Sequence, residues 1–327
     1  MTATLRESPP QQASLIKIPT APLPEGSTVA FVTARDGTRL RVAVWMPSNA
    51  RSSVIVLPGA TEYIELYGET IGELLARGNA VGILDWRGQG LSTRPLKDPR
   101  RRHIDNFRTY VDDFRLIAET IYARLPKPWI LVCQSMGGNI GARILAERAP
   151  GIAAAVLLAP MLAVNTGAWP LPAARVVARA SCTLGLSSRY VPGGSGTSAF
   201  AVPFEANTLT HDPRRFAWLS AYPAAEPALD IGSPTIGWLQ AAFESMDQLA
   251  RPAIARRISC PVLLVMAEED LVVRNGAIEG FSKLLPNGRL LKLSNARHDI
   301  LLEGELVREA FWREYDAFVA DLPVATL

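Results

Sequence analysis

The chain has 327 residues, 48% of them hydrophobic and 20% charged, which allows a large core and excludes an intrinsically disordered protein. Thirty-four Lys and Arg against 31 Asp and Glu give a net charge of +3, too small to indicate a nucleic-acid partner. The cysteines and histidines are far apart and indicate neither a disulfide framework nor a metal site: Cys133, Cys182, Cys260, His103, His211 and His298.

No segment of the sequence has the pattern of a leader or a membrane span. The first 20 residues lack the apolar core of a signal peptide. The longest apolar run, 151–164, is too short to cross a bilayer and contains Pro160. We therefore expect a soluble, cytoplasmic protein, for which transient contact with a membrane surface stays open.

The chain is expected to start with a flexible arm and a β-hairpin. Residues 1–27 are rich in Pro, Ser, Thr and Gln, a composition that favours a mobile, extended chain. Two short strands follow at 29–33 and 40–45. Asp36 and Gly37 between them are a turn signal, so these strands are expected to pair as a hairpin.

From residue 53 onward, apolar strands alternate with amphipathic helices. In the helix expected over 104–124, Phe107, Val111 and Phe114 recur at three- and four-residue steps. The other elements of this part are strands at 53–57, 80–85, 129–133 and 153–158 and helices at 67–77 and 137–148. The alternation predicts an α/β fold, a mostly parallel doubly wound sheet with helices on both faces.

The alternation stops over residues 161–259 and then returns. This block contains a Pro-rich piece at 169–172, a Gly- and Ser-rich piece at 193–198 and scattered aromatic residues. It is too long for a plain loop, and we interpret it as an inserted helical cap or lid. Strands at 261–266 and 290–293 and helices at 275–285 and 303–320 complete a core that we expect to comprise 28–160 and 260–327.

A serine stands where a buried strand turns into a helix. The strand 129–133 runs into Gln134-Ser135-Met136-Gly137-Gly138. A serine on such a sharp turn has its hydroxyl clear of the backbone, and the helix N-terminus presents amides to a developing oxyanion. The common pattern is Gly-x-Ser-x-Gly, and here Cys133 occupies the first position. The motif indicates a nucleophile but leaves open a simple helix N-cap.

Three further segments carry motifs that accompany this serine turn. They are Leu57-Pro58-Gly59-Ala60-Thr61-Glu62-Tyr63, Asp85-Trp86-Arg87-Gly88-Gln89-Gly90-Leu91-Ser92 and Ala296-Arg297-His298-Asp299-Ile300-Leu301. Together the four resemble the α/β-hydrolase family, and more narrowly its bacterial lysophospholipase and monoacylglycerol-lipase branch. The similarity spans about 28–320 and is weak in the cap. It implies the α/β-hydrolase fold, ester hydrolysis, and no metal or cofactor.

The resemblance implies a catalytic triad of Ser135, Asp270 and His298. The base, His298, follows the last expected strand, and Asp270 follows the strand before it, giving the chain order of this fold. Glu269 is the alternative acid, because three carboxylates stand in a row. Asp299 is discounted, because the family's acid comes from the earlier loop.

The resemblance also implies an oxyanion hole and a pocket residue. The two amides are expected from Met136, directly after the nucleophile, and from Ala60 in the loop after the third strand. Trp238 is expected at the pocket wall, while most other aromatic residues of the cap are its own core. His103 and His211 are interpreted as a helix-start residue and a turn residue. The glycines of 85–92 have the wrong spacing for a phosphate loop, so that segment is interpreted as structural.

A basic cluster precedes His103 and consists of Lys97, Arg100, Arg101 and Arg102. The simpler interpretation is a solvated loop, because charge runs usually face water. The alternative is a site for phosphate headgroups or anionic lipid.

We therefore expect a serine hydrolase that cleaves single-acyl lipid esters, monoacylglycerol or lysophospholipid, through an acyl-enzyme on Ser135. Its partner is a small-molecule lipid or ester substrate, and the sequence does not indicate an oligomeric state. A small-ester carboxylesterase and acyl transfer to an alcohol are the alternative enzymes. A non-catalytic ligand-binding protein is the alternative of another class, because a fold does not fix a function.

Overall fold

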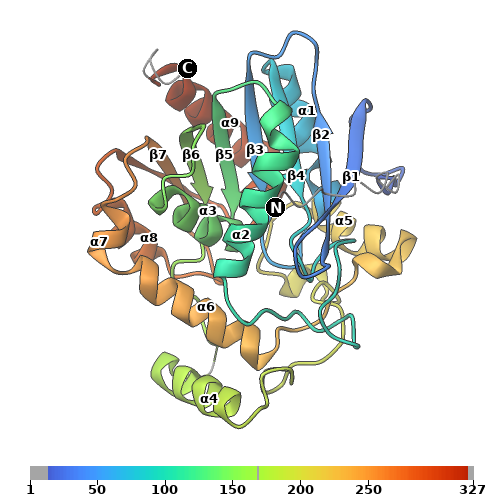
Figure 1. The fold of residues 1–327 in the computed structure, drawn as a ribbon, viewed down its shortest axis with the longest axis vertical. Helices are drawn as coiled ribbons and strands as arrows, with labels where there is room; N and C mark the ends of the chain where they lie inside the picture. Colours follow the sequence, from blue (N-terminus) through green and yellow to red (C-terminus); the bar gives the residue numbers. More distant parts are fainter. Residues whose placement is uncertain (1–13, 168, 323–327) are drawn as a thin grey trace, which may run out of the picture.

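An eight-stranded sheet forms the centre of the computed structural model, which describes residues 14–167 and 169–322 (Figure 1). The strand order is β1-β2-β4-β3-β5-β6-β7-β8, with β2 antiparallel to both neighbours and all other pairs parallel. The strands are β1 (Ser27–Thr33), β2 (Arg39–Trp45), β3 (Ser52–Leu57), β4 (Asn79–Leu84), β5 (Trp129–Gln134), β6 (Ile152–Leu158), β7 (Val262–Ala267) and β8 (Gly288–Leu293). The mostly parallel sheet expected from the alternating pattern is confirmed.

Helices cover both faces of this sheet. In Figure 1, α2 and α3 lie in front of it and α1 and α9 lie behind it. The helices are α1 (Gly68–Ala76), α2 (Arg108–Thr120), α3 (Met136–Ala146), α4 (Leu171–Thr183), α5 (Pro213–Ala225), α6 (Ile236–Leu249), α7 (Pro252–Ala255), α8 (Asn275–Ser282) and α9 (Glu305–Ala320), with 3-10 turns at Ile64–Tyr67, Tyr122–Arg124, Phe204–Ala206, Pro227–Leu229 and Ile300–Leu302. Every residue of β4, β5 and β7 is buried, which explains their continuous apolar sequences. Among the described residues, no helix has the length and hydropathy of a membrane span.

The N-terminal hairpin forms as expected. β1 pairs with β2 over its full length, and Gly37 in the turn has φ 83°, a conformation that glycine adopts without strain. Thr38 N–H donates to the Asp36 carboxylate at 3.0 Å, which closes the turn.

Residues 14–26 run along the body of the protein. Ile18 is buried, and two indole N–H groups donate to carbonyls of this segment: Trp45 to Pro24 and Trp218 to Thr20, both at 3.0 Å. A flexible arm is expected over 1–27, and its residues 1–13 lie outside the described residues. Residues 14–26 pack against the protein because buried indole N–H groups far away in the sequence need carbonyl acceptors. The amino-acid composition of the segment does not reveal this requirement.

Residues 161–259, the block interpreted as a cap, form helices α4 to α7. In Figure 1, α4 and α6 lie below the sheet, at the end where the parallel strands finish. The Ser245 hydroxyl of α6 donates to Asn139 Oδ1 of α3 at 2.6 Å, so this helix is fixed to the core. The loops that follow parallel strands all lie at the same edge of a sheet, so the block 161–259 lies next to these loops.

Candidate active site

Ser135 lies in the tight turn between β5 and α3. Its φ of 49° and ψ of −111° are rare for a residue with a side chain. A Cβ on Gly137 would lie 2.0 Å from the Leu57 carbonyl oxygen, so glycine is required there. Cys133 is accommodated because its Sγ packs against Gly141, where a Cβ would come within 2.7 Å of the sulfur. The turn therefore forms with cysteine in place of its first glycine.

Three side chains from separate loops form one chain of hydrogen bonds. His298 Nε2 lies 2.8 Å from Ser135 Oγ, and His298 Nδ1 lies 2.7 Å from Asp270 Oδ2. The exposed fractions of Ser135, Asp270 and His298 are 6%, 8% and 4%. The structure thus brings together the three residues that the sequence suggests as nucleophile, acid and base.

Of the three acidic candidates, Asp270 is the one whose carboxylate contacts the imidazole. Its other oxygen accepts hydrogen bonds from the amides of Val272 and Val273 at 2.8 and 2.9 Å. Glu269 is instead half-exposed and faces His211, at 3.3 Å. Asp299 accepts a hydrogen bond from Gln134 Nε2 at 3.1 Å. The backbone of the loop after β7 therefore fixes the orientation of Asp270.

The electrostatics of the site make His298 a stronger base. Burial by itself lowers the pKa of the imidazole, because it disfavours the charged ring. The hydrogen bond and the negative charge of Asp270 outweigh that effect and raise the pKa above its ordinary value. An imidazole with a raised pKa accepts a proton from a neighbouring hydroxyl more readily.

The two backbone positions expected for an oxyanion hole lie beside Ser135. Met136 is the first residue of α3, where an amide has no acceptor within its own helix. Ala60 lines the same cavity as Ser135 and His298. Ala60 therefore lies at the cavity of Ser135, and Met136 directly follows the serine in the chain.

The loop that contains Ala60 is held by side chains that sequence reasoning did not single out. The Trp86 indole donates to the Pro58 carbonyl at 2.9 Å, and Gln89 Nε2 donates to the Gly59 carbonyl at 3.0 Å. Both come from 85–92, the segment interpreted as structural. The spacing of its glycines gave no indication that it contacts this loop, because the contact forms only when β3 and β4 pair.

Two buried carboxyl groups link the Ala60 loop to the His298 loop. Glu62 accepts hydrogen bonds from the Gly59 amide and the Tyr67 hydroxyl. Burial and the nearby charge of Asp299 raise the pKa of Glu62 to about 8. Burial likewise raises the pKa of Asp299 to about 6, against the attraction of His298. At neutral pH these values favour the protonated form of Glu62 and the charged form of Asp299.

A cavity of about 470 Å³ opens at Ser135 and His298. Core loops and the block 161–259 both line it, and Trp238 of α6 contributes to the wall, as the sequence predicts. The Trp238 indole packs edge-on against Phe107, with ring centroids 5.7 Å apart. The lining of the cavity is mixed and includes the carboxyl groups of Glu62 and Asp299 as well as apolar side chains.

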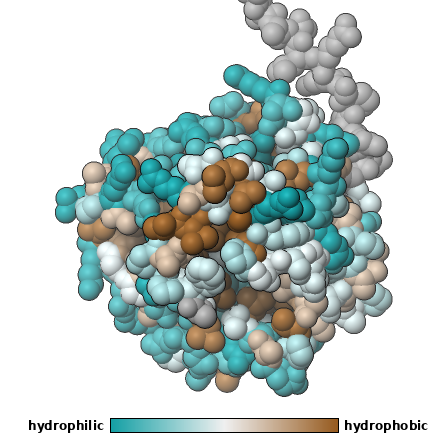
Figure 2. Space-filling view, turned by 90° about the horizontal axis from the view of Figure 1, so that it is seen from below, coloured by the Kyte–Doolittle hydropathy of each residue, from teal (hydrophilic) through white to brown (hydrophobic). Residues whose placement is uncertain are grey.

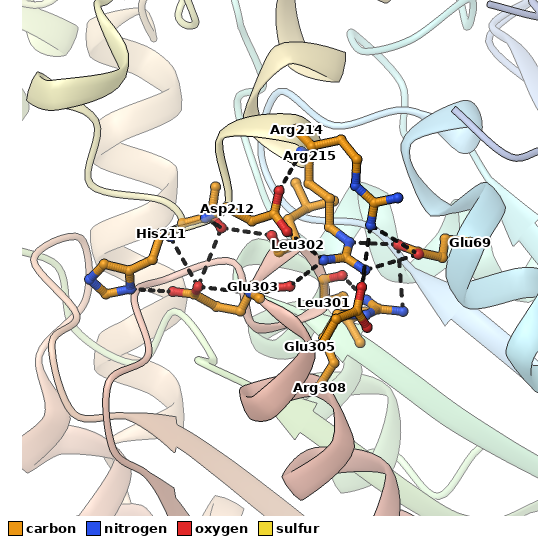
Figure 3. A network of polar contacts seen from close by, with 12 residues as sticks. Glu69, His211, Asp212, Arg214, Arg215, Leu301, Leu302, Glu303, Glu305 and Arg308 are labelled. Carbon is orange, nitrogen blue, oxygen red and sulfur yellow. Dashed lines mark hydrogen bonds and ion pairs between the residues drawn. The ribbon is translucent and has the colours of Figure 1, made fainter. Parts of the chain in front are cut away.

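The two other histidines lie outside this chain of hydrogen bonds. His103 Nδ1 is 2.8 Å from the Thr235 hydroxyl, so it joins the segment before α2 to α6. His211 Nδ1 is 3.0 Å from Glu303, just before α5 begins. Figure 3 shows that this contact belongs to a polar network between α5, α1 and α9.

Comparisons with known proteins agree on one family and one fold. Residues 48–305 match the family described as Serine aminopeptidase, S33 (Hydrolase_4). Probable lysophospholipase L2 of Haemophilus influenzae is 30% identical over 274 residues, covering 83% of this chain and 85% of the relative. Lysophospholipase L2 of Escherichia coli K12 is 32% identical over 266 residues, covering 78% and 76%.

Two solved structures share the architecture at low sequence identity. A soluble variant of monoglyceride lipase from Saccharomyces cerevisiae aligns with a TM-score of 0.73 and 16% identity, covering 91% of this chain and 97% of that chain. Paleococcus ferrophilus monoacylglycerol lipase aligns with a TM-score of 0.66 and 21% identity, covering 86% and 98%. Because both sequence identities are low, these comparisons support a shared fold.

Proposed function

This chain belongs to the serine aminopeptidase S33 family of hydrolases, with the α/β-hydrolase fold, and on that premise we propose that it cleaves esters of single-acyl lipids through an acyl-enzyme on Ser135. The substrate is monoacylglycerol or lysophospholipid. The observation that carries the proposal is the unbroken chain of hydrogen bonds from Asp270 through His298 to Ser135. That arrangement activates a hydroxyl that is otherwise a weak nucleophile.

In the proposed reaction, His298 Nε2 accepts the Ser135 proton as Oγ attacks the ester carbonyl carbon. The amides of Ala60 and Met136 stabilise the negative oxygen of the tetrahedral intermediate. Its collapse breaks the ester bond, and the leaving alcohol takes the proton from His298. Water then attacks the acyl-enzyme, again giving a proton to His298, and the fatty acid leaves as the proton returns to Ser135. Asp270 orients the imidazole and stabilises its charged form.

An apolar hollow beside the site supports a lipid ester as the substrate. The hollow has a volume of about 270 Å³, lies against α4 and shares Val164, Pro234 and Leu239 with the site cavity. An acyl chain in it would leave water while its ester faced Ser135. The lysophospholipase relatives support the same class of substrate.

Labelling with a fluorophosphonate probe tests the nucleophile. Mass-spectrometric mapping should find the label on Ser135 in the folded protein and not in a heat-denatured control. Ser135→Ala should lower ester turnover by about 10⁶-fold while the protein stays folded, because the chemical step loses its nucleophile. Label on another residue, or turnover retained in Ser135→Ala, would refute the proposal.

A series of acyl chain lengths tests the lipid substrate. Activity that rises from butyrate to palmitate esters supports it, because each added methylene would be buried in the hollow beside α4. Activity that falls steadily along the series supports a small-ester carboxylesterase instead. Product analysis with added alcohol distinguishes hydrolysis from acyl transfer.

Transient contact with a membrane surface and a cytoplasmic location are also part of the proposal. Figure 2 looks at the α4 end of the molecule and shows a hydrophobic area next to a hollow. The exposed apolar side chains on and beside α4 are Trp169, Val176, Leu184 and Leu186. Such a patch on a lipid hydrolase favours a lipid surface. The three free cysteines fit a reducing compartment, which cell fractionation would test.

A further inference from the structure

Arg102 is a cation in the wall of the site cavity whose charge has no partner in the described protein. It lines the cavity together with Ser135 and His298. Within residues 14–167 and 169–322 its guanidinium makes no hydrogen bond or ion pair, and its Nε is buried. Its neighbours differ, because Arg100 pairs with Asp230 at 2.7 Å and Arg101 pairs with Asp98 at 3.1 Å. Among the described residues, the three arginines of the basic cluster therefore divide into two that are paired and one that is not.

The backbone and one aromatic ring hold Arg102 in place. The Thr235 amide donates to the Arg102 carbonyl at 2.9 Å, and Arg102 forms a β-bridge with Pro234. The guanidinium carbon lies 4.4 Å from the centre of the Trp238 ring. Stacking covers a face of a guanidinium and does not use its N–H donors, which are the groups that match a planar or tetrahedral oxyanion.

Among the described residues that line the cavity, no acidic side chain forms an ion pair with this cation. Burial lowers the pKa of Arg102 to about 10, so the guanidinium is still charged at neutral pH. The other titratable groups that line the cavity are Glu62, Asp299 and His298. The raised pKa values of Glu62 and Asp299, about 8 and about 6, leave the two with one negative charge at neutral pH, and within the described residues neither forms an ion pair with Arg102. A partly desolvated cation without a counter-ion costs free energy, which an anionic ligand recovers.

We propose that Arg102 binds the phosphate of the substrate and thereby makes lysophospholipids better substrates than neutral monoacylglycerols. The inference rests on the proposed function, since both lipids share the ester that Ser135 attacks. They differ in the headgroup, which is a phosphodiester in one and a hydroxyl in the other. The guanidinium fork matches two oxygens of a phosphate, and a cavity of about 470 Å³ has room for a headgroup.

The test compares two substrates with the same acyl chain, a lysophosphatidylcholine and a monoacylglycerol. Arg102→Gln should lower kcat/KM for the lysophospholipid by about 10- to 100-fold, the range for a lost charge-assisted hydrogen bond. Its kcat/KM for the monoacylglycerol should fall much less, so the ratio of the two values should change by about 10-fold or more. Arg102→Lys should keep part of the preference, because it retains the charge but not the fork. Arg101→Gln is the matched control and should change neither value, because Arg101 is paired with Asp98 outside the cavity wall.

Thermal unfolding separates this role from a structural one. Arg102→Gln should leave the Tm unchanged or raise it, because the substitution removes an unpaired charge from a low-dielectric site. A lower Tm together with an equal loss of activity on both substrates would mean that Arg102 supports the fold, and would overturn the proposal. An unchanged substrate ratio in Arg102→Gln would overturn it as well.

A binding measurement keeps the inference testable even if the ester hydrolysis is absent. Calorimetry on the Ser135→Ala protein would compare glycerophosphocholine, inorganic phosphate and glycerol. The headgroup site is supported if glycerophosphocholine binds the Ser135→Ala protein and does not bind the double variant that also carries Arg102→Gln. This result does not depend on whether the wild type hydrolyses esters. Binding of inorganic phosphate alone would assign Arg102 to a free anion and overturn the headgroup. Turnover without either binding would leave the proposed function standing and refute the role of Arg102.

Discussion

Two regions near the site cavity, called here the charged wall around Arg215 and the α4 wall, do not themselves line the cavity and differ in how they are attached to the core. On one side, charged groups join the cap block to the core, as Figure 3 shows. The side chain of Arg215 is fully buried there and forms ion pairs with Glu69, Asp212 and Glu305, each at 2.6 or 2.7 Å. Glu303 beside it accepts the amide hydrogen of Arg297, next to the base. This wall holds the His298 loop in place.

The α4 wall is apolar and weakly attached. In α4, Ala178 is the buried residue, while Val176 is 68% exposed. Its ion pair, between Arg175 and Asp247, is at the surface, where such a pair stabilises little. Figure 2 shows the hydrophobic area at this end of the molecule. We infer that the charged wall positions the reacting groups and that the α4 wall adapts to the acyl chain.

After the loss of the nucleophile itself, Asp270→Asn has the largest expected effect, and it acts directly on His298, whose loop the charged wall holds. The amide favours the wrong tautomer of His298, and kcat should fall by about 10⁴-fold. His298 can accept a proton only when its imidazole is neutral, so kcat/KM should fall on the acid side as the ring becomes protonated. Because Asp270 raises the pKa of His298, this fall, the acid limb of the profile, should be centred above pH 6.5 in the wild type. In the variant the limb should move to lower pH. Stopped-flow kinetics from pH 5 to 9 checks both, and an unmoved limb would contradict the assignment of Asp270.

Arg215→Met should destabilise the fold by about 3–5 kcal/mol, because it leaves Glu69 and Asp212 without their buried partner. Urea unfolding measures the change. Arg214→Met is the matched control on the same helix, since Arg214 is more than half exposed and should cost less than about 1 kcal/mol. Equal costs for the two variants would remove the distinction between the walls.

Glu62→Gln should change how stability depends on pH. The pKa of Glu62 is raised to about 8, so its contribution is complete below its ordinary pKa of 4.5 and is lost as the pH rises to about 8. The wild type should lose up to about 1.4 kcal/mol per pH unit through this group over that window. Glutamine does not titrate, so the variant should have a flatter curve. Unfolding at pH 5, 6, 7 and 8 gives the slopes, and parallel curves would exclude a protonated Glu62.

Val176→Ser with Leu184→Ser should have the smallest effect on stability, within about 0.5 kcal/mol, because both side chains are exposed. Sedimentation with phosphatidylcholine vesicles should nevertheless show weaker binding. Leu306→Ser is the control, an exposed leucine of α9 outside this patch. If it weakens vesicle binding equally, α4 is not the contact surface.

The sequence by itself determined the fold and the candidate triad. Alternating apolar strands and helices fix a parallel sheet, because each strand must be buried on both faces. The turn around Ser135 is local, and Asp270 and His298 follow strands whose carboxyl ends meet at one edge. Neighbours along the chain, together with the resemblance to the α/β-hydrolase family, were therefore enough to suggest these residues.

Only the tertiary structure decided which charges are paired. Asp270 rather than Glu269 contacts His298 because of the backbone of one loop, and within residues 14–167 and 169–322 Arg102 is unpaired while Arg100 and Arg101 are paired. Neither difference is visible in a run of like residues. Burial and pairing depend on residues that are distant in the chain, such as Asp230 for Arg100, and they set both the pKa and the binding properties of a charged group.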